Sequence, residues 1–289
     1  MVSSRLEIPK TYKLFVGGKF PRSESGRTYE VSTPKGAFLA NAALASRKDA
    51  RDAVVAARAA QPGWAGATAY NRGQVLYRVA EVLEGRREQF VAEIRATEGG
   101  SAAAATKQVD AAIDAWVWYA GWCDKYPQVA GAGNPVAGPF FNLSVPEPTG
   151  VVVAIAPQGV AGGSLLGLVA TVAPILVAGN TVVVIPDEAR PLSAISLAEV
   201  LATSDLPGGV VNVLTGSPAE MAPWLAAHAD VNALDLTGAG DIDWVELEVA
   251  AAETLKRVTA PSPGIPAPSL ARILAVTETK TVWHTQAML

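Results

Sequence analysis

The stretch "VVVAIAPQGVAGGSLLG", residues 151–167, decides the fold. It begins with an unbroken apolar run rich in valine, which is typical of a strand buried on both faces of a parallel sheet. Pro157, Gly159 and Gly162 then predict a turn, and the apolar segment from Gly163 predicts a helix. Strand, turn and helix in this order often form ligand sites, yet this turn carries Gln158 and no nucleophile, acid or base.

The same alternation of apolar strands and helices continues after this stretch. The sequence predicts strands over 151–156, 181–185, 210–214, 232–236 and 256–259, and helices that begin near Gly163, Pro191, Pro218 and Asp241. Right-handed crossovers would arrange these elements as a doubly wound parallel sheet, so the expected fold class is α/β. Ligands of such sheets bind beyond the carboxyl ends of the strands, here at turns 157–163, 186–190, 215–219 and 237–243.

Amphipathic helices precede this region. Ser46 and Asp49 have the spacing of a capping box, and the helix that they open is expected to end near Pro62. Close to the other end of the chain, "PSPGIPAPS" (261–269) predicts a connector, because closely spaced prolines suit neither a helix nor a central strand. The β-branched segment after it predicts a lone strand.

Composition excludes several classes of function. The chain has 289 residues, half of them hydrophobic, and a net charge of −4 without a basic run, which argues against nucleic-acid binding. Cys123 is its one cysteine, so no internal disulfide or multi-thiolate zinc site is expected. Residues 151–186 carry no charge, but prolines and glycines interrupt them, which favours a buried core unit over a membrane span. The first ten residues lack an apolar signal segment, and the sequence predicts a cytoplasmic protein.

Several segments, taken in order, resemble the aldehyde dehydrogenase superfamily: "FVGGKF" (15–20), "EPTGVVVAIAP" (147–157), "AGNTVVVIPDEARPLSA" (178–194), "LPGGVVNVLTG" (206–216) and "TGAGD" (237–241). The family resemblance implies a nucleotide-binding domain for NAD or NADP. It also implies oxidation of aldehydes by a cysteine thiolate, with a glutamate-activated water that cleaves the thioester. The cofactor-binding positions that it implies are Ala156, Pro157, Gln158, Ile185, Glu188, Thr237 and Gly238.

The sequence departs from the family pattern at the residues that would stabilise the oxyanion and bind the nucleotide. The family's Pro-Trp-Asn is Pro157-Gln158-Gly159 here, which removes the amide that would stabilise an oxyanion, a loss of roughly 10²–10³ in rate. Ile185 replaces the lysine that holds the adenosine ribose. Asp241 and Asp243 follow the glycine turn and would repel a phosphate. The resemblance therefore implies that NAD or NADP binding is weakened or lost.

The catalytic residues of the family have no counterpart in this sequence. Pro261 and Ser262 stand where the family has the Glu-Leu-Gly-Gly segment of its general base. Residues 261–275 are too short for the catalytic domain that carries the cysteine. We therefore assign no catalytic residue and no metal site. The expected organisation is a nucleotide-binding domain at 1–260, a proline-rich connector at 261–275 and an oligomerisation strand at 276–289.

Three hypotheses follow. The first is a non-catalytic subunit that assembles with a full-length aldehyde dehydrogenase through the tail residues Thr277, Lys280, Val282 and Trp283. It resembles the cysteine-free second domain of long, two-domain family members. In the family, the closing strand pairs with a catalytic-domain sheet that a second copy of this chain would lack. The second hypothesis is an active NAD(P)-dependent aldehyde dehydrogenase that uses residues other than the family's catalytic ones, with Cys123 as its one thiol. The third is a nucleotide-binding sensor without turnover, supported by Glu188 and Gly238.

Overall fold

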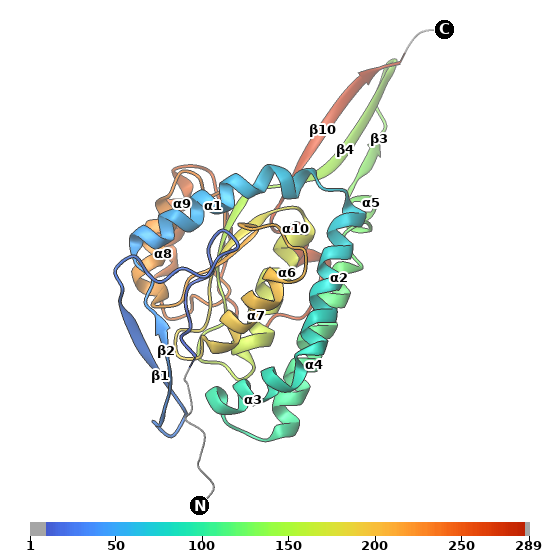
Figure 1. Ribbon diagram of the computed structural model, residues 1–289. Coiled ribbons are helices and arrows are strands. Elements are labelled where there is room, and N and C mark those ends of the chain that lie inside the picture. Colours follow the sequence, from blue (N-terminus) through green and yellow to red (C-terminus); the bar gives the residue numbers. More distant parts are fainter. Residues whose placement is uncertain (1–9, 287–289) are drawn as a thin grey trace, which may run out of the picture.

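A five-stranded parallel sheet forms the centre of the molecule. The computed structural model describes residues 10–286. The sheet has the order β7-β6-β5-β8-β9 (Figure 1). Its strands are β5 (Val151–Ile155), β6 (Thr181–Ile185), β7 (Val211–Val213), β8 (Ala233–Asp235) and β9 (Arg257–Thr259). The predicted α/β fold with a parallel sheet is confirmed, with strands equal to or slightly shorter than expected.

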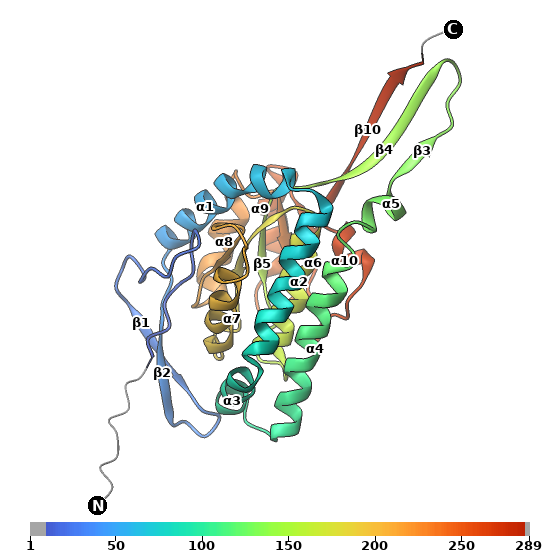
Figure 2. The same cartoon turned by 45° about the vertical axis from the view of Figure 1, so that its right-hand side comes forward.

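Helices cover both faces of this sheet, as Figures 1 and 2 show. Val152 and Ala154 point toward α2 (Ala69–Gly85), α3 (Arg87–Glu98), α4 (Ala102–Ala120), α6 (Leu168–Val177) and α7 (Leu192–Ala202). Val151, Val153 and Ile155 point toward α1 (Arg47–Gly66), α8 (Pro218–Ala227) and α9 (Trp244–Ala252). The alternation of side chains along β5 thus supplies two separate apolar cores.

The first long helix begins as predicted and ends later than predicted. Ser46 and Asp49 form the capping box of α1, and the Asp49 carboxylate also accepts a hydrogen bond from the Ser23 hydroxyl at 2.7 Å. The expectation that the helix ends near Pro62 is wrong, because α1 continues to Gly66. Trp64 is fully buried in the last turn, and its indole N–H donates to the Leu176 carbonyl at 3.1 Å. This packing offsets the hydrogen bond that proline removes from a helix interior.

The turn after β5 leads directly into helix. Gly162 adopts a left-handed conformation (φ 82°), and a π-helical turn, η1 (Gly163–Gly167), then continues into α6. Every residue of α6 is buried, including Pro174. Nowhere between residues 10 and 286 is there a helix with the length and apolar character to cross a bilayer.

A narrow arm projects from the body (Figures 1 and 2). It is a three-stranded antiparallel sheet of β10 (Thr277–Thr285), β4 (Phe140–Pro148) and β3 (Ala132–Asn134), in that order. The prediction of a lone strand near the end of the chain is wrong, because β10 pairs with β4 along its whole length, from Thr277↔Pro148 to Thr285↔Phe140. Residues 287–289 of the predicted tail lie outside the described residues. The proposed boundaries at 260 and 275 stay predictions.

Short elements complete the fold. β1 (Thr28–Ser32) and β2 (Phe38–Ala43) form a separate antiparallel pair. α5 (Tyr126–Ala130) precedes the arm, and α10 (Leu270–Leu274) leads into β10.

The buried side chain of Asn180 links the arm to the sheet. Its Oδ1 accepts from the Gly150 N–H at 2.8 Å and the Thr149 hydroxyl at 3.1 Å. Its Nδ2 donates to the Val276 carbonyl at 2.9 Å. One asparagine therefore fixes the start of β5, the start of β6 and the entry to β10.

Replacing Asn180 by Ala should lower the free energy of unfolding by about 2–4 kcal/mol, because buried backbone groups would lose their partners. Urea denaturation measures this change. Asn71→Ala, at an exposed position of α2, is the matched control and should change stability by less than about 0.5 kcal/mol. Equal effects of the two substitutions would contradict the role of Asn180.

Candidate functional site

A small cavity lies at the carboxyl edge of the sheet, where the sequence predicts a ligand site. Its volume is about 160 Å³, and its lining comprises Pro157, Gln158, Val160, Thr237, Gly238, Gly240, Asp241, Ser262, Pro263 and Gly264. The fold thus brings together four of the predicted cofactor-binding residues, namely Pro157, Gln158, Thr237 and Gly238. Three of the lining residues come from the proline-rich connector.

The side-chain amide of Gln158 makes its hydrogen bonds to the backbone of the turns themselves. Its Nε2 donates to the carbonyl of Ala156 at 2.7 Å and to that of Pro186 at 3.1 Å. Its Oε1 accepts from the backbone N–H of Glu188 at 3.0 Å. The side chain therefore joins the turns after β5 and β6, and its amide has no free donor aimed at a ligand.

The surroundings of the other predicted cofactor-binding positions indicate roles in the fold. Ala156 is buried, and a Cβ at position 238 would overlap its carbonyl group, which explains the glycine there. Ile185 is fully buried in the core beneath α1, α8 and α9 and does not line the cavity. The Glu188 side chain also lies outside the cavity. Burial raises the pKa of its carboxyl, and the negative charge of Glu220 raises that pKa further.

Carboxylates of the same chain accept hydrogen bonds from the backbone N–H groups around this turn. Glu98, at the end of α3, accepts from the N–H of Gly162 at 2.9 Å and from that of Ser164 at 3.1 Å. Asp187 accepts from the Gly159 N–H at 3.0 Å and forms an ion pair with Arg190 at 2.6 Å. N–H groups at a helix start favour anions, so these carboxylates take the places that a ligand anion would use. Sequence reasoning did not single them out, because Glu98 and the turn are far apart in the chain.

The connector and α10 cover the end of β8. The N–H of Ser262 donates to the Thr237 carbonyl at 3.2 Å, and the Ile265 side chain lies against Gly162. Arg272 bonds both the Asp235 carboxylate at 2.7 Å and the Thr237 hydroxyl at 2.8 Å. The side chains of Arg272 and Asp235 are only 13% and 6% exposed. This buried ion pair holds α10 against the sheet.

The cavity does not fit a whole dinucleotide. Pockets for drug-sized ligands occupy roughly 300–1,000 Å³, and this cavity has about 160 Å³. Asp241 is the charged residue of its lining, and the lining holds no lysine or arginine to pair with phosphates. Within residues 10–286, no cluster of three or more potential metal-ligating side chains of His, Cys, Asp or Glu is present.

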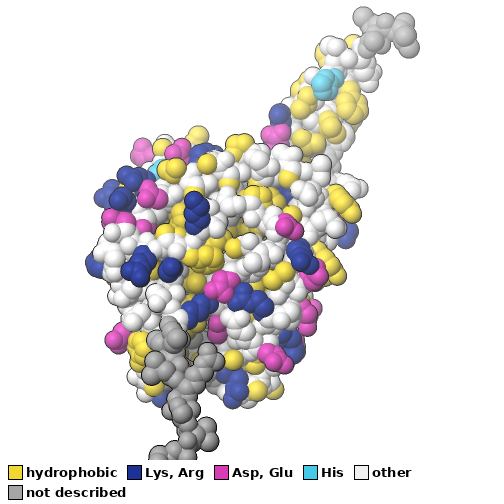
Figure 3. All heavy atoms as spheres, viewed as in Figure 1, with side chains coloured by type: hydrophobic (Ala, Val, Ile, Leu, Met, Phe, Trp, Pro, Cys, Tyr) yellow, Lys and Arg dark blue, Asp and Glu magenta, His cyan; other side chains and the backbone are white. Residues whose placement is uncertain are grey.

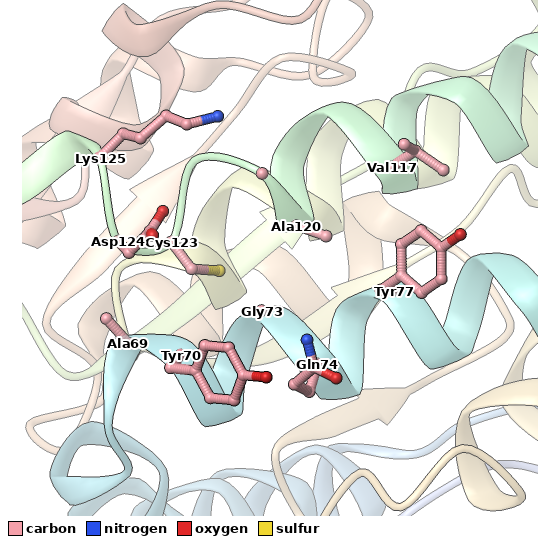
Figure 4. A pocket seen from close by; sticks show the side chains of 11 residues that line it. Ala69, Tyr70, Gly73, Gln74, Tyr77, Val117, Ala120, Cys123, Asp124 and Lys125 are labelled. Atoms are coloured by element: carbon pink, nitrogen blue, oxygen red, sulfur yellow. The ribbon is translucent and has the colours of Figure 1, made fainter.

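The single thiol lies elsewhere, in a groove between α2 and α4 (Figure 4). The groove has a volume of about 390 Å³, and Tyr70, Gln74, Tyr77 and Val117 form part of its lining. Cys123 is 1% exposed at its base, and its Sγ lies 3.8 Å from the carbonyl of Tyr119. Burial raises the pKa of the thiol to about 12, although the charge of Arg72 opposes this shift. Cys123 is therefore a protonated core residue at neutral pH.

The strand order and the helices on both faces define an α/β protein with a doubly wound parallel sheet. The profile of the aldehyde dehydrogenase family matches residues 20–265, and the chain belongs to this family.

Similar proteins agree with this membership. The chain is 33% identical to the cytosolic 10-formyltetrahydrofolate dehydrogenase of Mus musculus over 264 residues, which cover 88% of this chain and 28% of that protein. It is 34% identical to the cytosolic aldehyde dehydrogenase 1 of Elephantulus edwardii, over 86% of this chain and 49% of that protein. The solved NAD+ complex of the Bacillus cereus aldehyde dehydrogenase superposes with a TM-score of 0.78 at 28% identity, covering 86% of this chain and 50% of that one. The chain thus spans half or less of the length of these relatives.

The environment of Cys123 predicts slow chemical modification. At pH 8, the native thiol should react with a neutral maleimide on the order of 10³-fold more slowly than the unfolded chain, because its pKa lies well above the ordinary value of about 8.5. Mass spectrometry of samples labelled with and without denaturant measures the ratio. Equal rates would mean that Cys123 is an accessible, activated thiol.

The ion pair at the sheet edge predicts a second effect. Arg272→Met should lower the free energy of unfolding by about 3–5 kcal/mol, because it leaves the Asp235 carboxylate buried without its charged partner. Adding Asp235→Asn should restore part of this loss, since the double variant has no unpaired charge. Denaturant unfolding of both variants tests the pair, and a loss below about 1 kcal/mol for Arg272→Met would be inconsistent with it.

Proposed function

We propose that this chain is a non-catalytic aldehyde dehydrogenase-like subunit that assembles with a full-length aldehyde dehydrogenase. The observation that carries the proposal is the occupied carboxyl edge of the sheet. Gln158, Glu98 and the connector fill, with the chain's own groups, the region where ligands of such sheets bind.

The distribution of reactive groups supports the absence of turnover. Oxidation of an aldehyde by this family's chemistry needs a thiolate, and the pKa of the Cys123 thiol is about 12. The residues that line the cavity at the carboxyl edge include Thr237 and Ser262 but no cysteine, histidine or lysine. The Thr237 hydroxyl donates to the Asp235 carboxylate at 2.5 Å and accepts from Arg272 at 2.8 Å, and that carboxylate is itself ion-paired with Arg272, so this hydroxyl belongs to the network that holds α10.

The family makes NAD or NADP the candidate cofactor of this chain. The size and charge of the cavity support weak binding of the dinucleotide or none. A reducing cytoplasm is the proposed compartment, because the single cysteine forms no internal disulfide.

The arm supports the assembly. Within the described residues, β10 is the outer strand of the arm, so one of its edges is free for another chain. Lys280 pairs with Glu147 at 3.1 Å, Val282 lies opposite Leu143, and Trp283 is 58% exposed. We propose that an edge strand of the enzyme adds to β10 near Thr277, Lys280, Val282 and Trp283, with main-chain hydrogen bonds as the source of affinity.

The outer surface of α9 supports a second contact. Val245 and Val249 are 52% and 67% exposed, and they lie four positions apart on one face of the helix. Leu255 follows, 91% exposed and in a left-handed conformation (φ 53°) that ordinarily favours glycine. Exposed apolar side chains on one helix face are typical of a protein interface.

One observation favours a second candidate, a nucleotide-binding sensor without turnover. Thr237 and Gly238 still line a cavity at the carboxyl edge, which suits a ligand smaller than a dinucleotide. The hypothesis of an active dehydrogenase depends on Cys123, and the position of this thiol between α2 and α4 argues against it.

Affinity purification of the native protein tests the proposal. We expect a full-length aldehyde dehydrogenase to co-purify in a fixed ratio, and the chain alone to form no NADH with any aldehyde. As a control, the recombinant enzyme and the purified chain, once mixed, should elute together in gel filtration. Independent elution, or reduction of NAD by the chain alone, would overturn the proposal.

A further inference from the structure

We propose that the cavity at the base of the arm is a binding site for a small carboxylate with a short apolar chain, and that the guanidinium of Arg72 is the counter-ion of this ligand. The site is separate from the carboxyl edge of the sheet. It goes beyond the proposed function and does not depend on it.

The cavity lies between the end of α1, the start of α2, α5 and the base of β4, where the arm leaves the body (Figure 2). Its volume is about 590 Å³, which falls within the range of roughly 300–1,000 Å³ for small-molecule sites. One part of its wall is apolar and consists of Pro127, Val145, Pro146 and Pro148. This part is suited to contact with a hydrocarbon chain, because burial of apolar surface favours binding.

Arg72 is the cation of the lining, and it is only 6% exposed. Its Nε donates to the carbonyl of Val177 at 3.3 Å. Its Nη1 donates to the carbonyls of Ala65 at 3.4 Å and Ala67 at 2.5 Å. Within residues 10–286, no carboxylate forms an ion pair with Arg72. Because buried charges are ordinarily paired, an anion in the cavity would supply the counter-charge that the described chain does not.

The bonds to these carbonyls also fix the guanidinium of Arg72 in place. The carbonyls belong to the ends of α1 and α6, two elements packed into the body, and they leave Nη2 without a carbonyl partner. A donor that the fold already holds in position loses little conformational entropy when a ligand binds. Arg72 therefore offers a pre-positioned N–H group to an anion.

Two neutral side chains of the lining can donate to the same carboxylate. Tyr126 is buried, and its hydroxyl makes only a long hydrogen bond, of 3.4 Å, to the carbonyl of Ala178. Burial raises the pKa of this phenol, and the charge of Arg72 opposes the shift, so the two groups are close together. Gln61 is half-buried in the lining, and its amide adds two donors. Hydrogen bonds from a guanidinium, a phenol and an amide are those that a carboxylate accepts.

The charges around the cavity favour a carboxylate over a phosphate. Glu147 is the carboxylate of the lining, and it pairs with Lys280 at 3.1 Å, which leaves the charge of Arg72 unbalanced. A carboxylate carries one negative charge, whereas a phosphate ester carries roughly 1.5 to 2 at neutral pH. On the face shown in Figure 3, acidic and basic side chains are interspersed over the body, so the attraction for an anion would come from Arg72 itself.

Titration of the full chain with sodium butyrate, followed by its backbone amide signals in NMR, tests the site. Signals of the lining residues should shift and saturate, with a Kd on the order of 1–10 mM. Butyramide has the same size but no charge, and it should bind at least roughly tenfold more weakly. Inorganic phosphate should also bind more weakly than butyrate, because it lacks the apolar chain.

Variants at Gln61 separate binding from folding, because replacing Arg72 would also leave three carbonyls without their donor. Gln61→Glu keeps the shape of the side chain, but its carboxylate would repel butyrate and compete for Arg72, so the affinity should fall at least roughly tenfold. Gln128→Glu makes the same change at an exposed position of α5 outside the lining, and it should bind like the parent. Tyr126→Phe should weaken binding roughly three- to tenfold. Thermal unfolding verifies that each variant is folded.

The outcomes decide this inference separately from the proposed function. Butyrate that shifts no signal of the lining, butyramide that binds equally well, or an unchanged affinity in Gln61→Glu would overturn the site. Phosphate that binds more tightly than butyrate would overturn the assignment of a carboxylate. Because the titration uses the chain alone, its result leaves assembly with an aldehyde dehydrogenase to be tested by co-purification.

Discussion

The buried ion pair between Asp235 and Arg272 is the contact on which the arrangement of this molecule depends. Asp235 ends β8, next to the central strand of the sheet, and Arg272 belongs to the short helix that precedes the arm. A buried carboxylate is costly without a partner, so the chain between these two residues must return across the sheet. That return brings Ser262 and Ile265 against the turns at the carboxyl edge. One electrostatic requirement therefore both covers the carboxyl edge of the sheet and directs the chain toward β10.

The result is a family scaffold whose polar groups serve the fold. In the turn after β5, the glutamine donates to neighbouring carbonyls and the N–H groups donate to carboxylates of the same chain. Each such bond satisfies a group that a ligand would otherwise satisfy. The thiol is likewise a packing residue between two helices. Stability and binding compete here for the same donors and acceptors, and intramolecular bonds fill them.

The sequence predicted local features well and distant contacts poorly. The strands predicted at 151–156 and 181–185 and the capping box at Ser46 follow from patterns of a few residues; the structure has the strands at 151–155 and 181–185 and confirms the capping box. The end of α1 was wrong, because the burial of Trp64 against a segment more than a hundred residues away outweighs the effect of Pro62. The pairing of β10 with β4 was missed for the same reason. Four of the predicted cofactor positions do meet at one cavity, but the roles of Glu98 and Arg272 depend on partners that no local pattern reveals.

The position of Val276 has a consequence for the architecture of the chain. Its carbonyl accepts hydrogen bonds from Thr149 and Asn180. Thr149 directly follows β4, and Val276 directly precedes β10, so the segment from β5 to α10 begins and ends at nearly the same place at the base of the arm. Such a loop has its entry and exit fixed by the same few bonds, and its interior length is free to vary at little entropic cost. Each doubling of the length between β9 and α10 would cost only about 0.6 kcal/mol of loop-closure entropy, so the three strands of the arm tolerate a longer segment there. The neck of the arm is thus a position at which the fold accepts an insertion without loss of the arm.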